Sequence, residues 1–170
     1  MVNRRRFIGA ASAGAALAAA PGAQARPRQP DYYRLFLDVI LAWRRHDAEG
    51  VVARMSDAIV WYPAVGGPPV TGKARIREAL QALAPHRGAE RWRIFNHAVS
   101  GNRLLLEGVD DYDTDKGNRV AVPYMGIVEF EGRLISHWRD YFDAGLLARM
   151  KAGEPVPEVV LPLVSRQGEP

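Results

Sequence analysis

The sequence contains no cysteine among its 170 residues. A disulfide, a zinc–thiolate site, an iron–sulfur cluster and a thiol nucleophile are therefore excluded. The chain also lacks a His-Glu-x-x-His motif, a Gly-x-Ser-x-Gly motif and a glycine-rich phosphate loop. The histidines do not have the spacing of metal ligands; they are His46, His86, His97 and His137. We therefore expect neither a metal nor a cofactor.

The excess of positive over negative charge is small once the first 25 residues are set aside. The whole chain carries 23 basic and 19 acidic residues, a net charge of +4. Residues 1–25 contain three of the basic residues and no acidic one, which leaves 20 basic against 19 acidic residues, a net charge of +1. A nearly neutral domain has no electrostatic preference for phosphate, so we do not expect a nucleic-acid partner.

Long hydrophobic runs are few, and the one near the N-terminus, residues 7–20, is only weakly apolar. At about 14 residues it is too short to span a bilayer as a mature helix. It follows Arg4 and Arg5 and precedes a small-residue sequence at 23–25, which is the layout of a secretory signal peptide. The arginine pair followed by Phe7 favours the twin-arginine type.

We therefore expect residues 1–25 to be a twin-arginine signal, and the mature protein to begin at Arg26 in the periplasm or outside the cell. An ordinary Sec signal or an uncleaved anchor would have a similar layout. Replacing Arg4 and Arg5 by lysine should retain the precursor in the cytoplasm, which cell fractionation would show. Unchanged export would contradict the twin-arginine assignment.

Hydrophobic periodicity divides residues 26–152 into helices and strands in the order helix, helix, strand, helix, four strands, helix. The expected helices are 31–45, 46–55, 72–85 and 144–151, and the expected strands are 58–62, 90–99, 103–113, 119–130 and 133–142. This order predicts an α+β fold, a cone-shaped barrel in which a strongly bent, mostly antiparallel sheet wraps around three N-terminal helices. A pocket is expected between the concave face and the helices. The Pro-rich tail, residues 153–170, is expected to be extended, as a lid, a dimer contact or a disordered segment.

Two aspartates stand out because strand alternation puts each on an apolar or aromatic face. Asp110 shares its face with Tyr112, and Asp140 shares its face with Trp138 and Phe142. A carboxylate on such a face is costly unless it is paired or protonated. The two carboxyls therefore form an acid–base couple, or each is satisfied structurally by an arginine or a backbone amide. The acidic run of Asp111, Asp113 and Asp115 is expected to be a solvated hairpin turn, because it lacks the glycine and glutamate of a calcium loop.

Three segments of the C-terminal half, 107–110, 124–133 and 138–143, resemble the limonene-1,2-epoxide hydrolase family. That family belongs to the nuclear-transport-factor-2-like, or SnoaL-like, superfamily of cone-shaped folds. The resemblance implies cofactor-free addition of water to a small apolar epoxide, with Asp110 as general acid and Asp140 as general base. The family's third triad member, an arginine, falls on Gly108. Its water-binding Tyr and Asn fall on Trp61 and Pro63, or on Val60 and Tyr62 if the alignment is shifted by one residue.

Substrate contacts are expected from aromatic residues on the strands near the pocket: Trp61, Tyr62, Tyr124 and Trp138. Without the family arginine, the two carboxyls are expected to share one proton, so that one pKa lies above the ordinary value. Alternatively, another arginine such as Arg119 fills the gap.

The outer face of the last strand, with His137, Arg139 and Tyr141, is expected to contribute to a homodimer. The partner in the pocket is expected to be a small apolar molecule. Two other functions stay open on the same fold, a proton-transfer isomerase or cyclase and a hydrophobic-ligand-binding module without turnover.

Overall fold

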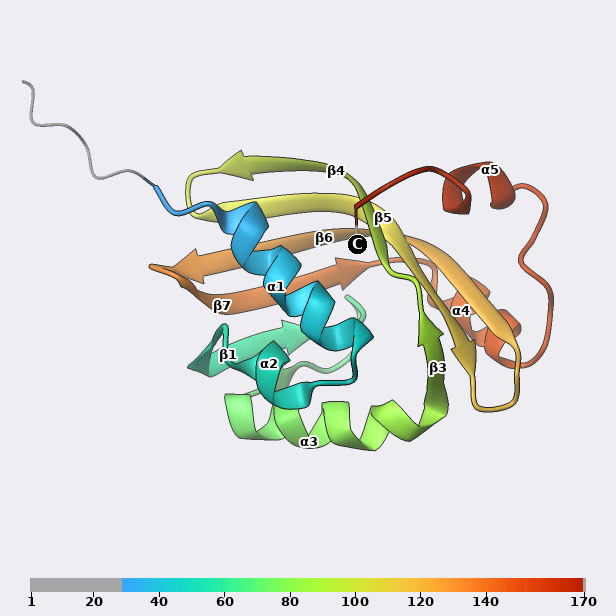
Figure 1. Cartoon of the computed structure of the whole chain (residues 1–170), viewed down its shortest axis with the longest axis horizontal. Helices are drawn as coiled ribbons and strands as arrows, with labels where there is room; N and C mark the ends of the chain where they lie inside the picture. The colour runs from blue at the N-terminus through green and yellow to red at the C-terminus, as the bar shows by residue number, and fades with distance from the viewer. Residues whose placement is uncertain (1–28, 170) are drawn as a thin grey trace, which may run out of the picture.

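The computed structural model describes residues 29–169, which form one layer of helices against a strongly curved sheet (Figure 1). The expected signal peptide, residues 1–25, lies outside the described residues. Within the described range, no helix combines the length and the apolar character that crossing a membrane requires. The predicted α+β class and cone-shaped architecture are confirmed.

The helical layer consists of α1 (Tyr32–Arg44), α2 (Ala48–Val52) and α3 (Lys73–Leu83). Each of the first two helices begins after an aspartate whose side chain accepts a hydrogen bond from a backbone N–H of the first turn; these are Asp31 and Asp47. Such a cap satisfies one of the otherwise unpaired N–H groups at a helix start. The predicted helix positions follow from these caps and from the apolar face that α1 buries against the sheet.

The sheet has seven strands in the order β2-β1-β7-β6-β5-β3, with β4 also paired to β5. Their bounds are β1 Met55–Tyr62, β2 Val70–Thr71, β3 Arg87–Glu90, β4 Arg93–Ser100, β5 Arg103–Thr114, β6 Arg119–Glu131 and β7 Leu134–Tyr141. All neighbours are antiparallel except β1 and β7, which are parallel. The strand expected over 90–99 corresponds to β4, which begins three residues later, and the short strand β3 before it was not expected; β3 and β4 pair with different parts of β5.

The core lies between the concave face of the sheet and α1, and its centre is aromatic. Trp138 is fully buried and meets the ring edge of Phe36 from α1 and that of Trp43. Trp61 and Trp92 pack against Trp43 on its other sides. Burying one such side chain stabilises the fold by roughly 1.5–3 kcal/mol, so this cluster ties α1 firmly to the sheet.

The C-terminal part packs against the inner side of the sheet and then crosses part of its outer face. Helix α4 (Ala144–Lys151) packs Leu146 and Met150 against the inner side of β5 and β6. The tail is expected to be extended, but it contains the short helix α5 (Leu161–Val164). This helix places Val164 on the outer face of the sheet against Val109 and Ala121. It ends with Glu169 paired to Ile94 of β4.

Asp111 is a buried ion-pair centre and not part of a solvated turn, which corrects the expectation for the acidic run. Its side chain is 0% exposed on the outer face of β5 and pairs with Arg91 and Arg119, each at 2.9 Å, and with Arg93 at 3.5 Å. Burial opposes ionisation, but Arg119 and Arg91 outweigh it and hold the pKa of Asp111 below its usual value. Arg119 is therefore engaged here and does not lie between Asp110 and Asp140.

Candidate functional site

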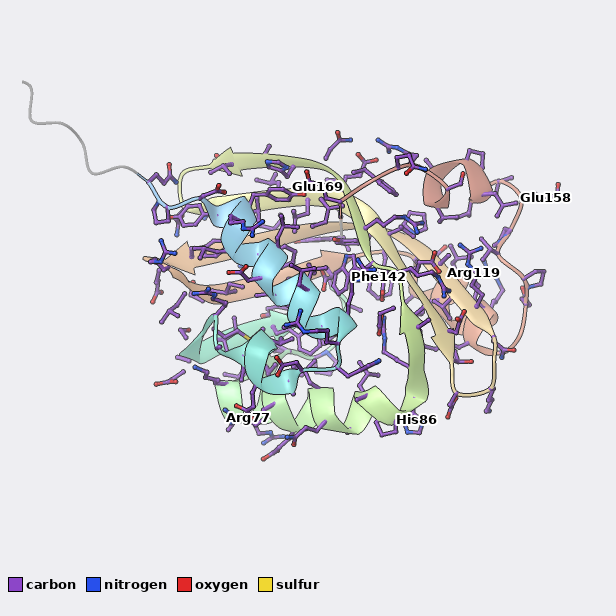
Figure 2. All side chains as sticks on the ribbon, viewed as in Figure 1. Arg77, His86, Arg119, Phe142, Glu158 and Glu169 are labelled. Atoms are coloured by element: carbon purple, nitrogen blue, oxygen red, sulfur yellow. The ribbon has the colours of Figure 1, made fainter. Side chains whose placement is uncertain are left out.

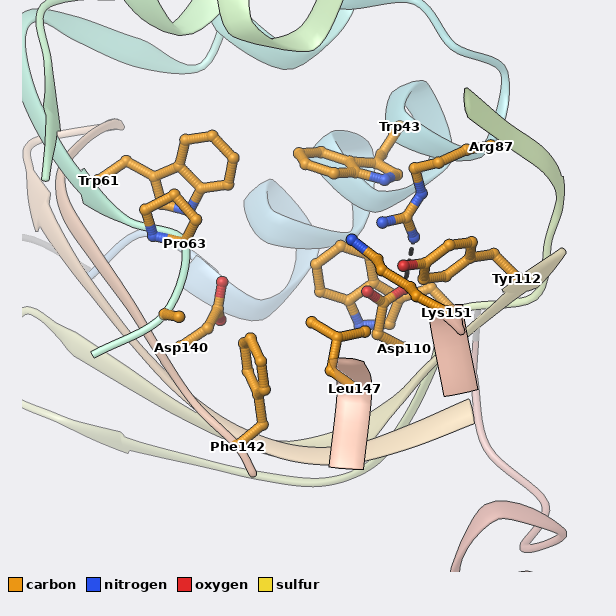
Figure 3. Close-up of a pocket in the computed structure, with 12 residues that line it drawn as sticks. Trp43, Trp61, Pro63, Arg87, Asp110, Tyr112, Asp140, Phe142, Leu147 and Lys151 are labelled. Carbon is orange, nitrogen blue, oxygen red and sulfur yellow. Dashed lines mark hydrogen bonds and ion pairs between the residues drawn. The ribbon is translucent and has the colours of Figure 1, made fainter. Parts of the chain in front are cut away.

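A cavity of about 230 Å³ opens between the concave face of the sheet, the end of α1 and helix α4. Most of its wall is apolar, and the carboxyls of Asp140 and Asp110 lie on opposite sides of it (Figure 3). It is lined by Trp43, Trp61, Pro63, Ala64, Arg87, Trp92, Asp110, Tyr112, Asp140, Phe142, Leu147 and Lys151. Both predicted aspartates thus reach the same cavity.

Asp140 occupies one side of the cavity, on β7 opposite Gly126 of β6. Gly126 leaves room for the carboxyl, because a Cβ atom there would lie only 3.3 Å from Oδ1. The indole N–H of Trp138 donates a hydrogen bond of 2.8 Å to the same oxygen. The buried N–H of Trp61 also influences the carboxyl, although it makes no hydrogen bond of ordinary geometry.

Burial raises the pKa of Asp140 to about 8. The nearby indole N–H groups of Trp138 and Trp61 lower this pKa in part, and the negative charge of Asp110 raises it further. At neutral pH this carboxyl is therefore protonated and can donate a proton into an apolar cavity. Catalytic carboxylic acids are tuned in this way by desolvation.

Asp110 occupies the opposite side and is held by Arg87 of β3. The guanidinium donates a hydrogen bond of 2.7 Å to Asp110 and one of 2.9 Å to Glu90. It also lies 3.4 Å from the centre of the Tyr112 ring. The Arg87 side chain is only 8% exposed and that of Glu90 is fully buried.

The buried environment perturbs the ionisation of Arg87 and Glu90. Burial disfavours the charged guanidinium, but Asp110 and Glu90 outweigh that effect and raise the pKa of Arg87. For Glu90, burial outweighs the attraction of Arg87, so its pKa lies above the ordinary value. Arg87 thus fixes the Asp110 carboxylate from within the protein and leaves its cavity-facing side accessible.

The raised pKa expected for one of the two carboxyls is found at Asp140, but within residues 29–169 no hydrogen bond joins the carboxyls, which corrects the expectation of a shared proton. Strand β6 separates the strands that carry them. Across β6, Asp140 is in register with Leu106 of β5, and Leu106 precedes Asp110 by four residues. The raised pKa of Asp140 comes mainly from burial, and Asp110 contributes the least of the named causes.

Gly108, the position of the family arginine, has no space for a side chain. A Cβ atom there would collide with the Arg93 carbonyl oxygen and would come within 2.8 Å of the Tyr124 ring. The arginine that reaches Asp110 comes from β3 instead. An arginine does fill part of the gap, but it is Arg87 and not Arg119, and it pairs with only one of the two aspartates.

The four expected aromatic contacts divide into two groups. Trp61 lines the cavity, and Trp138 lies beneath it as a hydrogen-bond donor to Asp140. Tyr62 is half-buried and Tyr124 is buried, with its hydroxyl accepting a hydrogen bond of 2.6 Å from Trp92, and neither lines the cavity.

Sequence reasoning missed Trp43, Arg87, Glu90, Leu147 and Lys151. No local motif marks them, because they converge only through the curvature of the sheet. Within the described range, no group of three or more potential metal-ligating side chains is close enough to hold a metal ion.

Residues 34–138 match the family model for the SnoaL-like domain. A solved LEH-like epoxide hydrolase from M. tuberculosis is 25% identical, with a TM-score of 0.61 over 78% of this chain and 95% of that chain. An NTF2-like protein of unknown function from Burkholderia pseudomallei is 17% identical, with a TM-score of 0.65 over 72% and 98%. A putative SnoaL-like polyketide cyclase from Shewanella putrefaciens is 14% identical, with a TM-score of 0.64 over 75% and 100%. A search of curated proteins found no match.

Proposed function

Since this chain belongs to the SnoaL-like domain family, we propose that its cavity performs cofactor-independent acid–base catalysis on a small apolar substrate. The observation that carries the proposal is Asp140, a buried carboxyl with a pKa of about 8 at the wall of an aromatic cavity. The reaction we propose is the addition of water to an epoxide. The likeness to the LEH-like epoxide hydrolase supports this choice among the activities that the fold can host.

In this reaction Asp140 acts as the acid and Asp110 as the base, the reverse of the roles that the family resemblance implies. A water oxygen attacks an epoxide carbon while the carbon–oxygen bond breaks. Asp110 accepts the proton of the water, and Asp140 donates its proton to the leaving oxygen. Solvent returns the proton from Asp110 to Asp140 after the diol leaves. The ion pair with Arg87, at 2.7 Å, holds the Asp110 side chain in place as the group that accepts this proton.

A second candidate is proton transfer on a carbon acid, as in an isomerase or a cyclase. The observation that favours it is the isolation of Asp140, which has no cation or second carboxyl hydrogen-bonded to it within the described residues. A single carboxyl with a pKa near neutrality can both remove and return a proton. Asp110 would then have no chemical role.

Two aspartate variants separate these candidates. Asp110→Asn and Asp140→Asn are each assayed for diol formation from cyclohexene oxide and for deuterium exchange into cyclohexanone. We expect the wild type to form diol and each variant to lose about 10²–10⁴-fold of that rate. Asp57→Asn, an exposed position on β1, serves as the control.

Other outcomes would contradict the hydrolase proposal. Exchange without diol, lost only in Asp140→Asn, favours the isomerase or cyclase. Binding of both compounds without any product favours a binding module.

We also propose that the protein forms a homodimer through the outer face of the sheet. Met125 and Tyr141 face each other across β6 and β7 and are 53% and 41% exposed. Large apolar side chains exposed side by side are typical of an interface. Light scattering at micromolar concentration should give twice the monomer mass, and Met125→Glu should reduce it to the monomer mass. A monomeric wild type would contradict the proposal.

A further inference from the structure

A second cavity adjoins the catalytic one and shares three lining residues with it. It has a volume of about 380 Å³ and lies where the end of α3 approaches the β5–β6 turn and α4. The shared residues are Arg87, Tyr112 and Lys151. The remaining lining residues are Leu83, His86, Thr114, Asp115 and Lys116, and Figure 2 shows His86 below β3 at this end of the molecule.

The basic side chains at this junction are not equivalent. Arg87 is neutralised by Asp110 and Glu90, and His86 lies 2.9 Å from Asp115. Lys116 and Lys151, by contrast, have no ion-pair partner in the part of the chain that the structure describes. Figure 3 shows the Lys151 side chain extending across the catalytic cavity toward Trp43. An unpaired ammonium group therefore lies where the two cavities meet.

The charge of the walls decides which ligand fits. The Arg87 guanidinium already covers the Tyr112 ring and lies 5.8 Å from the centre of the Trp43 ring. A cationic ligand would have to displace it and would be repelled by Lys151. An anionic group at the junction gains a charge-assisted hydrogen bond from Lys151, while the aromatic walls take an apolar body.

We propose that the substrate is a small apolar molecule carrying a carboxylate, which Lys151 binds at the junction of the two cavities while Lys116 adds electrostatic attraction. This inference rests on the proposed function, because it names the substrate class of the same cavity. Binding to Lys151 orients the substrate with its charged end toward α4 and its apolar body between Trp61, Trp92 and Phe142. The reacting carbon then lies between Asp140 and Asp110.

A matched pair of non-reacting probes tests the proposal through binding alone. Cyclohexanecarboxylate and its neutral isostere cyclohexanecarboxamide are titrated into the mature protein at pH 7 and low salt, with tryptophan fluorescence as the readout. We expect the carboxylate to bind about tenfold more tightly, the effect of one hydrogen bond to a charged group. Lys151→Gln should abolish this preference and Lys151→Arg should keep most of it. Lys73→Gln, which removes the same charge at the start of α3, should leave it unchanged.

Equal affinities for the two probes, or no binding of either, would overturn the proposal. A preference for the carboxylate that persists in Lys151→Gln would overturn it as well. Because neither probe is turned over, these outcomes do not depend on diol formation. Loss of the proposed hydrolase activity and loss of the proposed anion recognition are therefore distinguishable.

Discussion

Asp140→Asn is expected to lower kcat for diol formation by about 10²–10⁴-fold while leaving probe binding within a few-fold of the wild type. The amide keeps the shape of the side chain and can still interact with the Trp138 indole, but it has no acidic proton to give. Wild-type activity should fall as pH rises through about 8, because only the protonated Asp140 can act as the acid. A rate that increases through this pH would show that Asp140 acts as a base.

The same substitution is expected to stabilise the folded protein at alkaline pH. The pKa of Asp140 is about 8 in the folded state and 3.8 for a free side chain, so the folded state binds this proton more tightly. The Asp140 proton therefore contributes fully to the free energy of unfolding below about pH 4. This contribution is lost as the pH rises to about 8, at roughly 1.4 kcal/mol per pH unit. Asparagine carries no charge at any of these pH values and avoids the loss.

Thermal unfolding at pH 5 and pH 9 measures this effect. We expect Asp140→Asn to raise Tm relative to the wild type at pH 9 by more than at pH 5. The exposed Asp57→Asn variant should show no such pH dependence. Equal effects of Asp140→Asn at both pH values would show that the carboxyl is not desolvated in the folded protein.

Arg87→Met is expected to reduce the free energy of unfolding by roughly 3–5 kcal/mol. Methionine fills part of the volume but leaves the fully buried Glu90 carboxyl and the Asp110 carboxyl without their cation. Burying an uncompensated charge is far more costly than losing a surface ion pair. Urea unfolding of the purified variant measures the loss.

Two further variants separate this effect from lost packing. In Arg87→Met/Glu90→Gln the second substitution removes one of the uncompensated acids, so the double variant should be more stable than Arg87→Met alone. Arg77 makes a comparable pair with Glu49, but on the surface, where Glu49 is 67% exposed. Arg77→Met should therefore cost no more than about 1 kcal/mol. Similar losses for Arg77→Met and Arg87→Met would contradict the role given to burial.

The helices and most of the strands could be predicted because their signals are local. Asp31 and Asp47 cap helices whose apolar faces recur at helical spacing, and strand alternation put Asp110 and Asp140 on the inner face of the sheet. The short strand β3 was not predicted in the same way. It has four residues and forms only by pairing with the end of β5, beyond the part that pairs with β4.

The polar partners of the site were not predictable, because they depend on the curvature of the sheet. Arg87 lies 23 residues before Asp110 with β4 between them, and the pairing of β3 with β5 brings the two side chains to 2.7 Å. Asp111 shows the converse case. It looks like part of a polar hairpin turn in the sequence, yet three arginines, from the β3–β4 connection, β4 and β6, allow its complete burial.

The proposed mechanism requires Asp140 to hold a proton at neutral pH inside the cavity. The pH titration of the carboxyl carbon NMR signals of the aspartates measures this, and the Asp140 signal is identified as the one missing from the spectrum of Asp140→Asn. We expect that signal to titrate near pH 8. A midpoint near pH 4 would mean that Asp140 is ionised at neutral pH, and it would contradict the assignment of Asp140 as the acid.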